Sequence, residues 1–375
     1  MTHDIALKVL GQIMGWDDER AGREFTWLTL MSRLKFDGYQ DFEAGVRMIE
    51  SLAVWLQQFD PADREAAYRF LRNVVLYLGP AEMLRLVELF FPVTVQRRLM
   101  HAAAQQTGVP AYQVWSNPAS ASAYDRLLRC TLFVGMSEGA RLDLFRRANA
   151  GLVSNEQVLL ATYADKEKWD DLLDNLREDL KDPQARFGAV YLIDDFAGSG
   201  LTFIRKDKGK WKGKLKKFRQ SVVDGFDTYF DPGVQFFVHH YIATHDAAEN
   251  LRRRQGEALT ELGAEGWITP VRFTFGMILR EDFPVDRSPL EDAQTFLALA
   301  ERYYDPKIKT KHFDVGGDDE IQLGFAGCAL PLVLEHNTPN NSVALLWAES
   351  ELPADWSPED AHVMRPLFRR RQRHT

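Results

Sequence analysis

The stretch VYLIDDFAGSGLT, from Val190 to Thr202, constrains the fold of this chain more than any other. It begins with an apolar run rich in β-branched and aromatic residues, which is typical of a buried parallel strand. Asp194 and Asp195 follow, where such a strand reaches the surface at its carboxyl end. We therefore predict a ligand site at this strand end.

The loop after the two acids predicts a phosphate site. Gly198 and Gly200 permit a tight turn with converging backbone N–H groups, while Ser199 and Thr202 add hydroxyl donors at the start of an expected helix. Because carboxylates accept hydrogen bonds from a vicinal diol, the whole stretch suits a ribose 5-phosphate. The alternative is an ordinary strand-to-helix turn, with an aspartate as the cap and glycines for curvature.

The same residues resemble the signature of the type I phosphoribosyltransferases, which is an apolar strand, two acids and a Thr/Ser-Gly-x-Thr loop. The segment 199–202 departs from it only in having Ser in place of the usual first Thr. The resemblance implies an α/β fold with a parallel-sheet phosphoribosyltransferase-like core of type I. It also implies that Asp194 and Asp195 are catalytic acids on the ribose diol, and that the phosphate is bound by Ala197, Gly198, Ser199, Gly200, Leu201 and Thr202.

A second apolar strand, from Cys130 to Val134, ends in a loop bracketed by glycines. In the family that the chain resembles, such a loop holds the pyrophosphate of phosphoribosyl pyrophosphate. The candidate residues here are Gly135, Ser137, Glu138, Gly139 and Arg141. The alternative is a plain strand-to-helix turn with Arg141 in solvent. A helix from about Lys166 to Leu180 then leads back to the Asp194 strand, which predicts parallel strands with a right-handed connection.

A turn rich in carboxamides follows the last apolar strand near residue 334. Carboxamides donate and accept at once, which suits the edge of a nucleobase, so Asn337, Asn340 and Asn341 are candidates for base recognition. Asn-Pro turns also occur for purely conformational reasons, and this alternative stays open.

Residues 205–219 are abruptly basic, with nine cations in fifteen residues. One interpretation is contact with a nucleic-acid backbone in which Trp211 stacks on a base. The candidate residues are Lys206, Lys208, Lys210, Trp211, Lys212 and Lys214. The alternative is an exposed, flexible insertion.

The chain as a whole predicts two structural parts. Residues 1–105 have apolar residues at helical spacing and predict an N-terminal all-helical or winged-helix-like module. Residues 106–125 contain glycine, proline and a serine/alanine cluster, which favours a linker. Residues 126–375 are then the phosphoribosyltransferase-like domain, with the basic insertion 205–219.

Composition excludes several classes of protein. A net charge of -8 argues against wholesale coating of nucleic acid, and the two cysteines have no metal-ligand spacing, so we expect no metal held by protein ligands. The beginning of the sequence lacks the pattern of a signal peptide, and no apolar run is long enough for a bilayer. We therefore expect a cytoplasmic location.

Three strings, LFVGMSEGARLDLFRR, YLIDDFAGSGLTF and EHNTPNNSVALLW, resemble the phosphoribosyltransferase-like proteins of bacterial conflict systems. These include proteins encoded beside retron reverse transcriptases. The resemblance implies a toxic anti-phage effector, either a glycosyltransferase or a nucleotide glycosidase, that acts on a nucleotide or on phosphoribosyl pyrophosphate. It also implies substrate-borne Mg2+ and, as partners, a retron reverse transcriptase with its msDNA and RNA.

Two other functions remain open at this stage. The same fold could sense a nucleotide or dock nucleic acid without turnover, although a pure scaffold does not need both acids. Ordinary nucleotide salvage is the third possibility, and the large helical module and the basic insertion weaken it.

Overall fold

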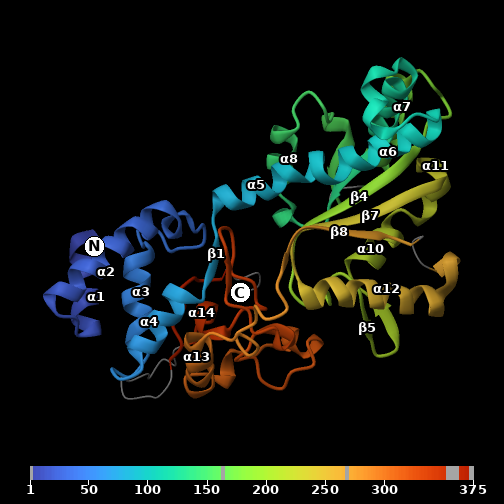
Figure 1. Cartoon of the computed structure of the whole chain (residues 1–375). Coiled ribbons are helices and arrows are strands. Elements are labelled where there is room, and N and C mark those ends of the chain that lie inside the picture. The colour runs from blue at the N-terminus through green and yellow to red at the C-terminus, as the bar shows by residue number, and fades with distance from the viewer. Residues whose placement is uncertain (1–2, 162–164, 267–269, 352–362, 371–375) are drawn as a thin grey trace. The chain divides into compact units, whose positions relative to one another are not determined.

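The computed structural model describes residues 3–161, 165–266, 270–351 and 363–370 (Figure 1). The chain forms two compact units. We call Leu84–Leu279 the sheet unit, and Met1–Met83 together with Arg280–Thr375 the two-segment unit. This division differs from the expected one, because the last part of the chain groups with the N-terminal segment.

The sheet unit is built on five parallel strands in the order β3-β2-β4-β7-β8. Every neighbouring pair in this order is parallel, which confirms the predicted α/β fold. The strands are β2 (Thr131–Gly135), β3 (Val158–Leu160), β4 (Phe187–Ala197), β7 (Phe230–Thr244) and β8 (Arg272–Leu279).

Helices cover both faces of this sheet, as Figure 1 shows. They are α5 (Pro80–Phe90), which begins in the other unit, α6 (Gln96–Thr107), α7 (Pro118–Arg129), α8 (Leu142–Ala148), α9 (Lys166–Leu180), α10 (Lys214–Ser221), α11 (Phe226–Tyr229) and α12 (His245–Gly266). Helix α9 confirms the predicted crossover. Helix α7 shows that the expected linker 106–125 is wrong, because much of it is helical.

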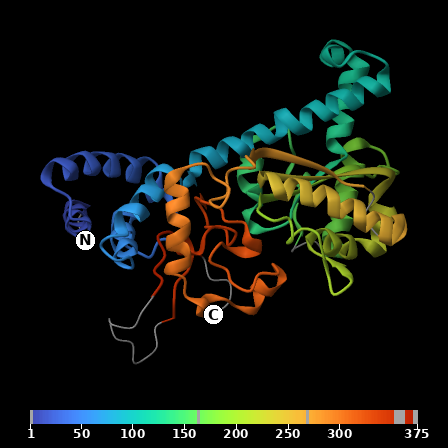
Figure 2. The same cartoon turned by 60° about the horizontal axis from the view of Figure 1, so that its bottom comes forward.

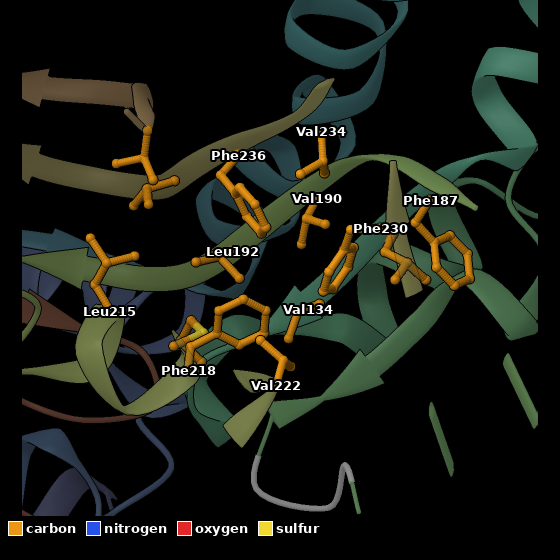
Figure 3. Close-up of a cluster of buried hydrophobic side chains, with 14 of the residues drawn as sticks. Val134, Phe187, Val190, Leu192, Leu215, Phe218, Val222, Phe230, Val234 and Phe236 are labelled. Carbon is orange, nitrogen blue, oxygen red and sulfur yellow. The ribbon is translucent and has the colours of Figure 1, made fainter. Parts of the chain in front are cut away.

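Alternating side chains of the strands build a separate core on each face. On one face, Val190 and Leu192 of β4 and Phe236 of β7 meet Leu215 and Phe218 of α10 (Figure 3). Helix α12 covers the same face, and Figure 2 shows it beside β8. On the other face, aromatic rings pack together from α5, α8 and the strands, namely Phe90, Phe133, Phe145, Tyr191 and His239. The acids therefore lie near the end of a strand that is packed on both faces.

The strand β4 is not followed by the expected helix. Residues 198–204 form bends and turns, and an antiparallel hairpin of β5 (Arg205–Asp207) and β6 (Lys210–Lys212) comes next. Helix α10 begins only after this hairpin. The basic insertion is therefore folded, and the expectation of a helix directly after Thr202 is wrong.

The two-segment unit combines N-terminal helices with C-terminal segments. Its helices are α1 (His3–Met14), α2 (Asp18–Leu34), α3 (Met48–Gln57), α4 (Arg64–Asn73), α13 (Glu291–Arg302) and α14 (Ala344–Trp347). Strand β1 (Leu76–Leu78) pairs in parallel with β9 (Leu332–Leu334), and the rings of Phe70 and Phe296 stack with centroids 3.7 Å apart. Among the described residues, no helix combines the length and the apolar character needed to cross a membrane.

Candidate functional site

The two predicted acids lie near the carboxyl end of β4. Asp194 pairs in register with His240 of the neighbouring strand β7, and β4 continues to Ala197. Because successive side chains of a strand point to opposite faces, the two carboxylates leave β4 in opposite directions. Their environments differ accordingly.

Asp194 is buried, with 3% of the residue exposed, and its two carboxylate oxygens have different partners. The hydroxyl of Ser137, in the glycine-bracketed loop, donates to Oδ1. The ammonium of Lys214, the first residue of α10, donates to Oδ2. A buried charge needs such partners, because an uncompensated carboxylate in the interior is costly. A ligand diol that reaches Asp194 must therefore take the place of at least one of these groups.

Asp195 is part-exposed and borders the loop after β2. A Cβ atom added to Gly139 would lie 2.5 Å from Oδ2 of Asp195, which is far inside van der Waals contact. A side chain at position 139 would therefore displace the carboxylate of Asp195. This contact brings together one predicted acid and one residue of the predicted pyrophosphate loop.

The loop from Gly135 to Arg141 joins β2 to α8. The backbone N–H of Met136 donates to the carbonyl of Ile193 over 2.8 Å, which fastens the loop beside β4. Gly135 is needed for packing, because an added Cβ would lie 2.7 Å from Cδ1 of Leu142. Glu138 is exposed, and Arg141 has a left-handed backbone with φ 51° just before α8. The structure thus brings Ser137 and Gly139 to the two acids, as the sequence predicts.

The predicted phosphate loop, Ala197 to Thr202, is held by α12 and its neighbouring strand. The Thr244 hydroxyl donates to the carbonyl of Gly198 over 2.6 Å, and Arg254 donates to the carbonyl of Ser199 over 3.1 Å. Gly200 has φ +74°, a conformation that favours glycine. Ser199 is buried, with its hydroxyl 3.3 Å from the N–H of Leu201, whereas Thr202 is exposed. Hydrogen bonds from Thr244 and Arg254 to two of its carbonyls therefore hold the bend in place.

His240 lies beside the acids and is a residue that the sequence interpretation missed. Burial lowers the pKa of His240 to about 4, with Asp194 and Asp195 opposing the shift and Lys214 adding to it. The imidazole is therefore neutral at pH 7. The sequence does contain a signal for His240. A pair of histidines follows the apolar run of β7, just as the pair of aspartates follows the apolar run of β4.

The basic insertion does not present its tryptophan to a ligand. Trp211 is 3% exposed in the core, and its indole N–H donates to Glu261 of α12 over 2.9 Å. Stacking of Trp211 on a base is therefore wrong for this fold. Three of the candidate lysines have acidic partners: Lys206 pairs with Glu261, Lys212 with Asp207, and Lys214 with Asp194. Lys208 and Lys210, at the hairpin turn, are exposed.

The three asparagines proposed for base recognition lie in the two-segment unit. The amide of Asn341 is buried and donates to the carbonyl of Phe325 over 3.0 Å and to the sulfur of Cys328 over 3.2 Å. The backbone carbonyl of Asn340 accepts from the N–H of Phe325 over 2.6 Å, and Asn337 pairs through its backbone with Leu334. Asn341 therefore has a structural function in this unit, and base recognition by the three residues stays a prediction.

Metal-ligand clusters and cavities bear on what the sheet unit can bind. Within the described ranges, no group of three or more His, Cys, Asp or Glu side chains could hold a metal ion. A cavity of about 590 Å³ elsewhere in the sheet unit is lined by residues such as Leu128, Arg129, Arg146 and Leu152, and its lining contains neither of the two acids and no residue of the two predicted loops.

A comparison with models of known protein families matches this chain. The protein-family model described as PRTase-CE matches residues 52–359, which is more than half of the chain. The matched range contains both predicted loops and both acids. No curated protein and no solved structure is a significant match to the chain.

Proposed function

Because the chain belongs to the PRTase-CE family and is thus phosphoribosyltransferase-like, we propose that it acts at the C1 bond of a ribose 5-phosphate. The substrate is a nucleotide or phosphoribosyl pyrophosphate, and the bond made or broken joins C1 to a base or to pyrophosphate. One observation carries the proposal. The acids of β4, the bend after them and the Gly139 loop meet at the carboxyl end of one parallel sheet.

The chemistry needs few protein groups. Cleavage at C1 gives the sugar oxocarbenium character, and nearby carboxylates stabilise this positive charge. In our proposal Asp195, which is the more exposed acid, meets the ribose diol first, and the bend from Ala197 to Thr202 holds the 5-phosphate. The Gly135–Arg141 loop takes the pyrophosphate. Catalysis then consists mostly of positioning.

We expect Mg2+ to arrive with the substrate. Mg2+ keeps much of its coordination shell on water and on phosphate oxygens, and it needs only one or two carboxylates from a protein. Asp195, at the part-exposed edge of the site, is the carboxylate that we propose for that purpose. In this proposal the ion is a part of the pyrophosphate substrate.

The biological setting that we propose is anti-phage defence in the cytoplasm, with the protein as a toxic effector. The motif strings around Gly135, Asp194 and Asn340 support it, since they resemble conflict-system proteins encoded beside retron reverse transcriptases. A retron reverse transcriptase with its DNA and RNA is the proposed partner. A second candidate function is nucleotide sensing without turnover, which the burial of Asp194 under Lys214 favours.

Mass spectrometry of the nucleotide pool after expression tests the activity. We expect the wild-type chain to change the pool, and Asp195→Asn, alone or with Asp194→Asn, to lower the rate at least ~100-fold, because charge stabilisation at C1 is lost. The matched control is Asp171→Asn with Asp174→Asn, two exposed carboxylates of α9. An unchanged pool with wild-type protein that binds the nucleotide supports sensing, and a double acid variant with full activity contradicts the assigned site.

A further inference from the structure

Lys214 occupies a defined position between the phosphate loop and the acids. Its backbone N–H donates to the carbonyl of Thr202 over 3.1 Å, and the N–H of Leu215 donates to the carbonyl of Phe203 over 3.2 Å. Gly213 before it has φ +124°, and a Cβ there would lie 2.3 Å from the carbonyl oxygen of Phe203. The start of α10 is thus fixed against the end of the loop.

The side chain of Lys214 reaches the other end of the same loop. Its ammonium donates to Oδ2 of Asp194, which precedes the bend, while its backbone is bound to Thr202, which ends it. The side chain of Lys214 is 25% exposed and that of Asp194 is 5% exposed. The Lys214 side chain is therefore part-exposed beside the buried acid, and the residue contacts both ends of the predicted phosphate loop.

The charges around Lys214 are unfavourable for the start of a helix. The first turn of α10 contains Lys214, Lys216 and Lys217 and no acidic residue. Cations at a helix N-terminus are unfavourable because the helix dipole is positive there. Such violations are expected where a residue serves a site. Asp194 offsets the charge of Lys214, and the neighbouring imidazole of His240 stays neutral and does not compete for this acid.

We propose that Lys214 binds the phosphoryl oxygens of the ligand, an inference that rests on the proposed function. The ligand diol donates to Asp194 as the Lys214 ammonium moves to the phosphoryl group. In this exchange the buried carboxylate keeps hydrogen-bond donors, now from the diol hydroxyls, and the ammonium keeps an anionic partner. It also makes the site selective, since an unphosphorylated riboside leaves Lys214 on Asp194.

Calorimetric titration with ribose 5-phosphate, ribose and inorganic pyrophosphate tests this inference. Lys214→Met is expected to bind the anion that Lys214 contacts roughly tenfold or more weakly, and this binding is expected to depend less on salt concentration. The affinity of the variant for ribose is expected to be unchanged or higher. Lys214→Arg keeps the charge and is expected to retain most of the affinity. Lys217→Met removes an exposed lysine of the same helix and is the matched control. The anion that Lys214→Met binds less tightly shows whether Lys214 contacts the 5-phosphate or the pyrophosphate.

A second comparison keeps the test decisive if Lys214→Met folds poorly, because that variant leaves Asp194 buried without its cation. Asp194→Asn is then compared with the double variant Asp194→Asn, Lys214→Met, and the double variant is expected to bind one of the two anions less tightly. The inference is overturned if wild type and Lys214→Met bind both anions with equal affinity. It is also overturned if Asp194→Asn and the double variant do so. Either result leaves the proposed function in place. Wild-type protein that binds neither anion contradicts the proposed function, and the inference fails with it.

Discussion

Buried polar groups serve different purposes in the two units. In the two-segment unit they end on fixed partners: the indole N–H of Trp55 donates to the carbonyl of Leu345 over 2.7 Å, and the N–H of Thr338 donates to the hydroxyl of Tyr39 over 3.1 Å. In the sheet unit, Asp194 and Lys214 form a charged pair at the edge of solvent. The first kind joins distant parts of the sequence, and in our proposal a ligand takes over partners of the second kind. This difference in partners is the basis on which we assign a function to Asp194.

Among variants that compare the two units, truncation of a core side chain is expected to change the free energy of unfolding most. Phe296→Ala in the two-segment unit and Phe236→Ala in the sheet unit each remove a buried ring, so each is expected to lower the free energy of unfolding by about 3–5 kcal/mol in urea titrations. Only Phe236→Ala is expected to weaken ribose 5-phosphate binding as well. Phe236 packs against Phe218 of α10, the helix that begins with Lys214 (Figure 3). An equal loss of affinity in both variants would contradict the separation of the units.

The buried histidine pair predicts an acid-sensitive sheet unit. Burial lowers the pKa of His240 from 6.5 to about 4, and the pKa of His239 is also lowered by burial and by His240. The unfolded chain therefore binds more protons between pH 6.5 and 4. The free energy of unfolding is expected to fall as the pH drops through this window, by up to about 3 kcal/mol for His240.

Hydrogen exchange, corrected for the intrinsic rate, checks this prediction unit by unit. Protection of β7 amides is expected to fall below pH 6.5 more steeply than protection of α13 amides. His245→Gln is the matched control, because the His245 side chain is 39% exposed and is expected to leave the pH dependence of β7 unchanged. Parallel losses of protection in β7 and α13 would rule out the assignment to the histidine pair.

Loss of one hydrogen-bonding group gives the smallest effect. Tyr39→Phe is expected to lower the free energy of unfolding by about 1–3 kcal/mol, because the buried N–H of Thr338 loses its acceptor and the Tyr39 hydroxyl no longer donates to the carbonyl of Arg369. Glu261→Ala in the sheet unit removes the acceptor of the Trp211 indole and leaves the core ring in place, and it is expected to cost less, since Glu261 is well solvated. Thermal unfolding of the two variants compares them directly, and the reverse order would show that the hairpin depends on the Glu261 contact more than its exposure indicates.

Local patterns predicted the sheet unit well. The apolar runs around Val134, Leu192 and Val238 are each long enough to identify a strand, and the stripe of α9 identifies the crossover. The resemblance to type I phosphoribosyltransferases assigned the loop after β2 and the acids of β4 to one site, and Ser137 and Gly139 do lie beside these acids. The strands and the crossover themselves needed only patterns local in the sequence.

Long-range contacts explain what the sequence could not reveal. β1 and β9 are three-residue strands, and only their pairing across the whole chain assigns residues 280–375 to the unit of the N-terminal segment. Lys214 could not be separated from the other cations of its segment, because its partner Asp194 lies before the hairpin. Trp211 looked available for stacking, since nothing local indicates that Glu261 covers it.

The split composition of the two-segment unit has a consequence for biosynthesis. A ribosome makes Met1–Met83 and must then make Leu84–Leu279 and residues 280–331 before β9, the strand that pairs with β1, emerges. At roughly 5–20 residues per second, this interval lasts on the order of ten to fifty seconds. The sheet unit is contiguous and can fold during this time, whereas the leading helices wait with apolar surface uncovered. The N-terminal segment is thus expected to keep apolar surface uncovered until residues 280–334 have been made.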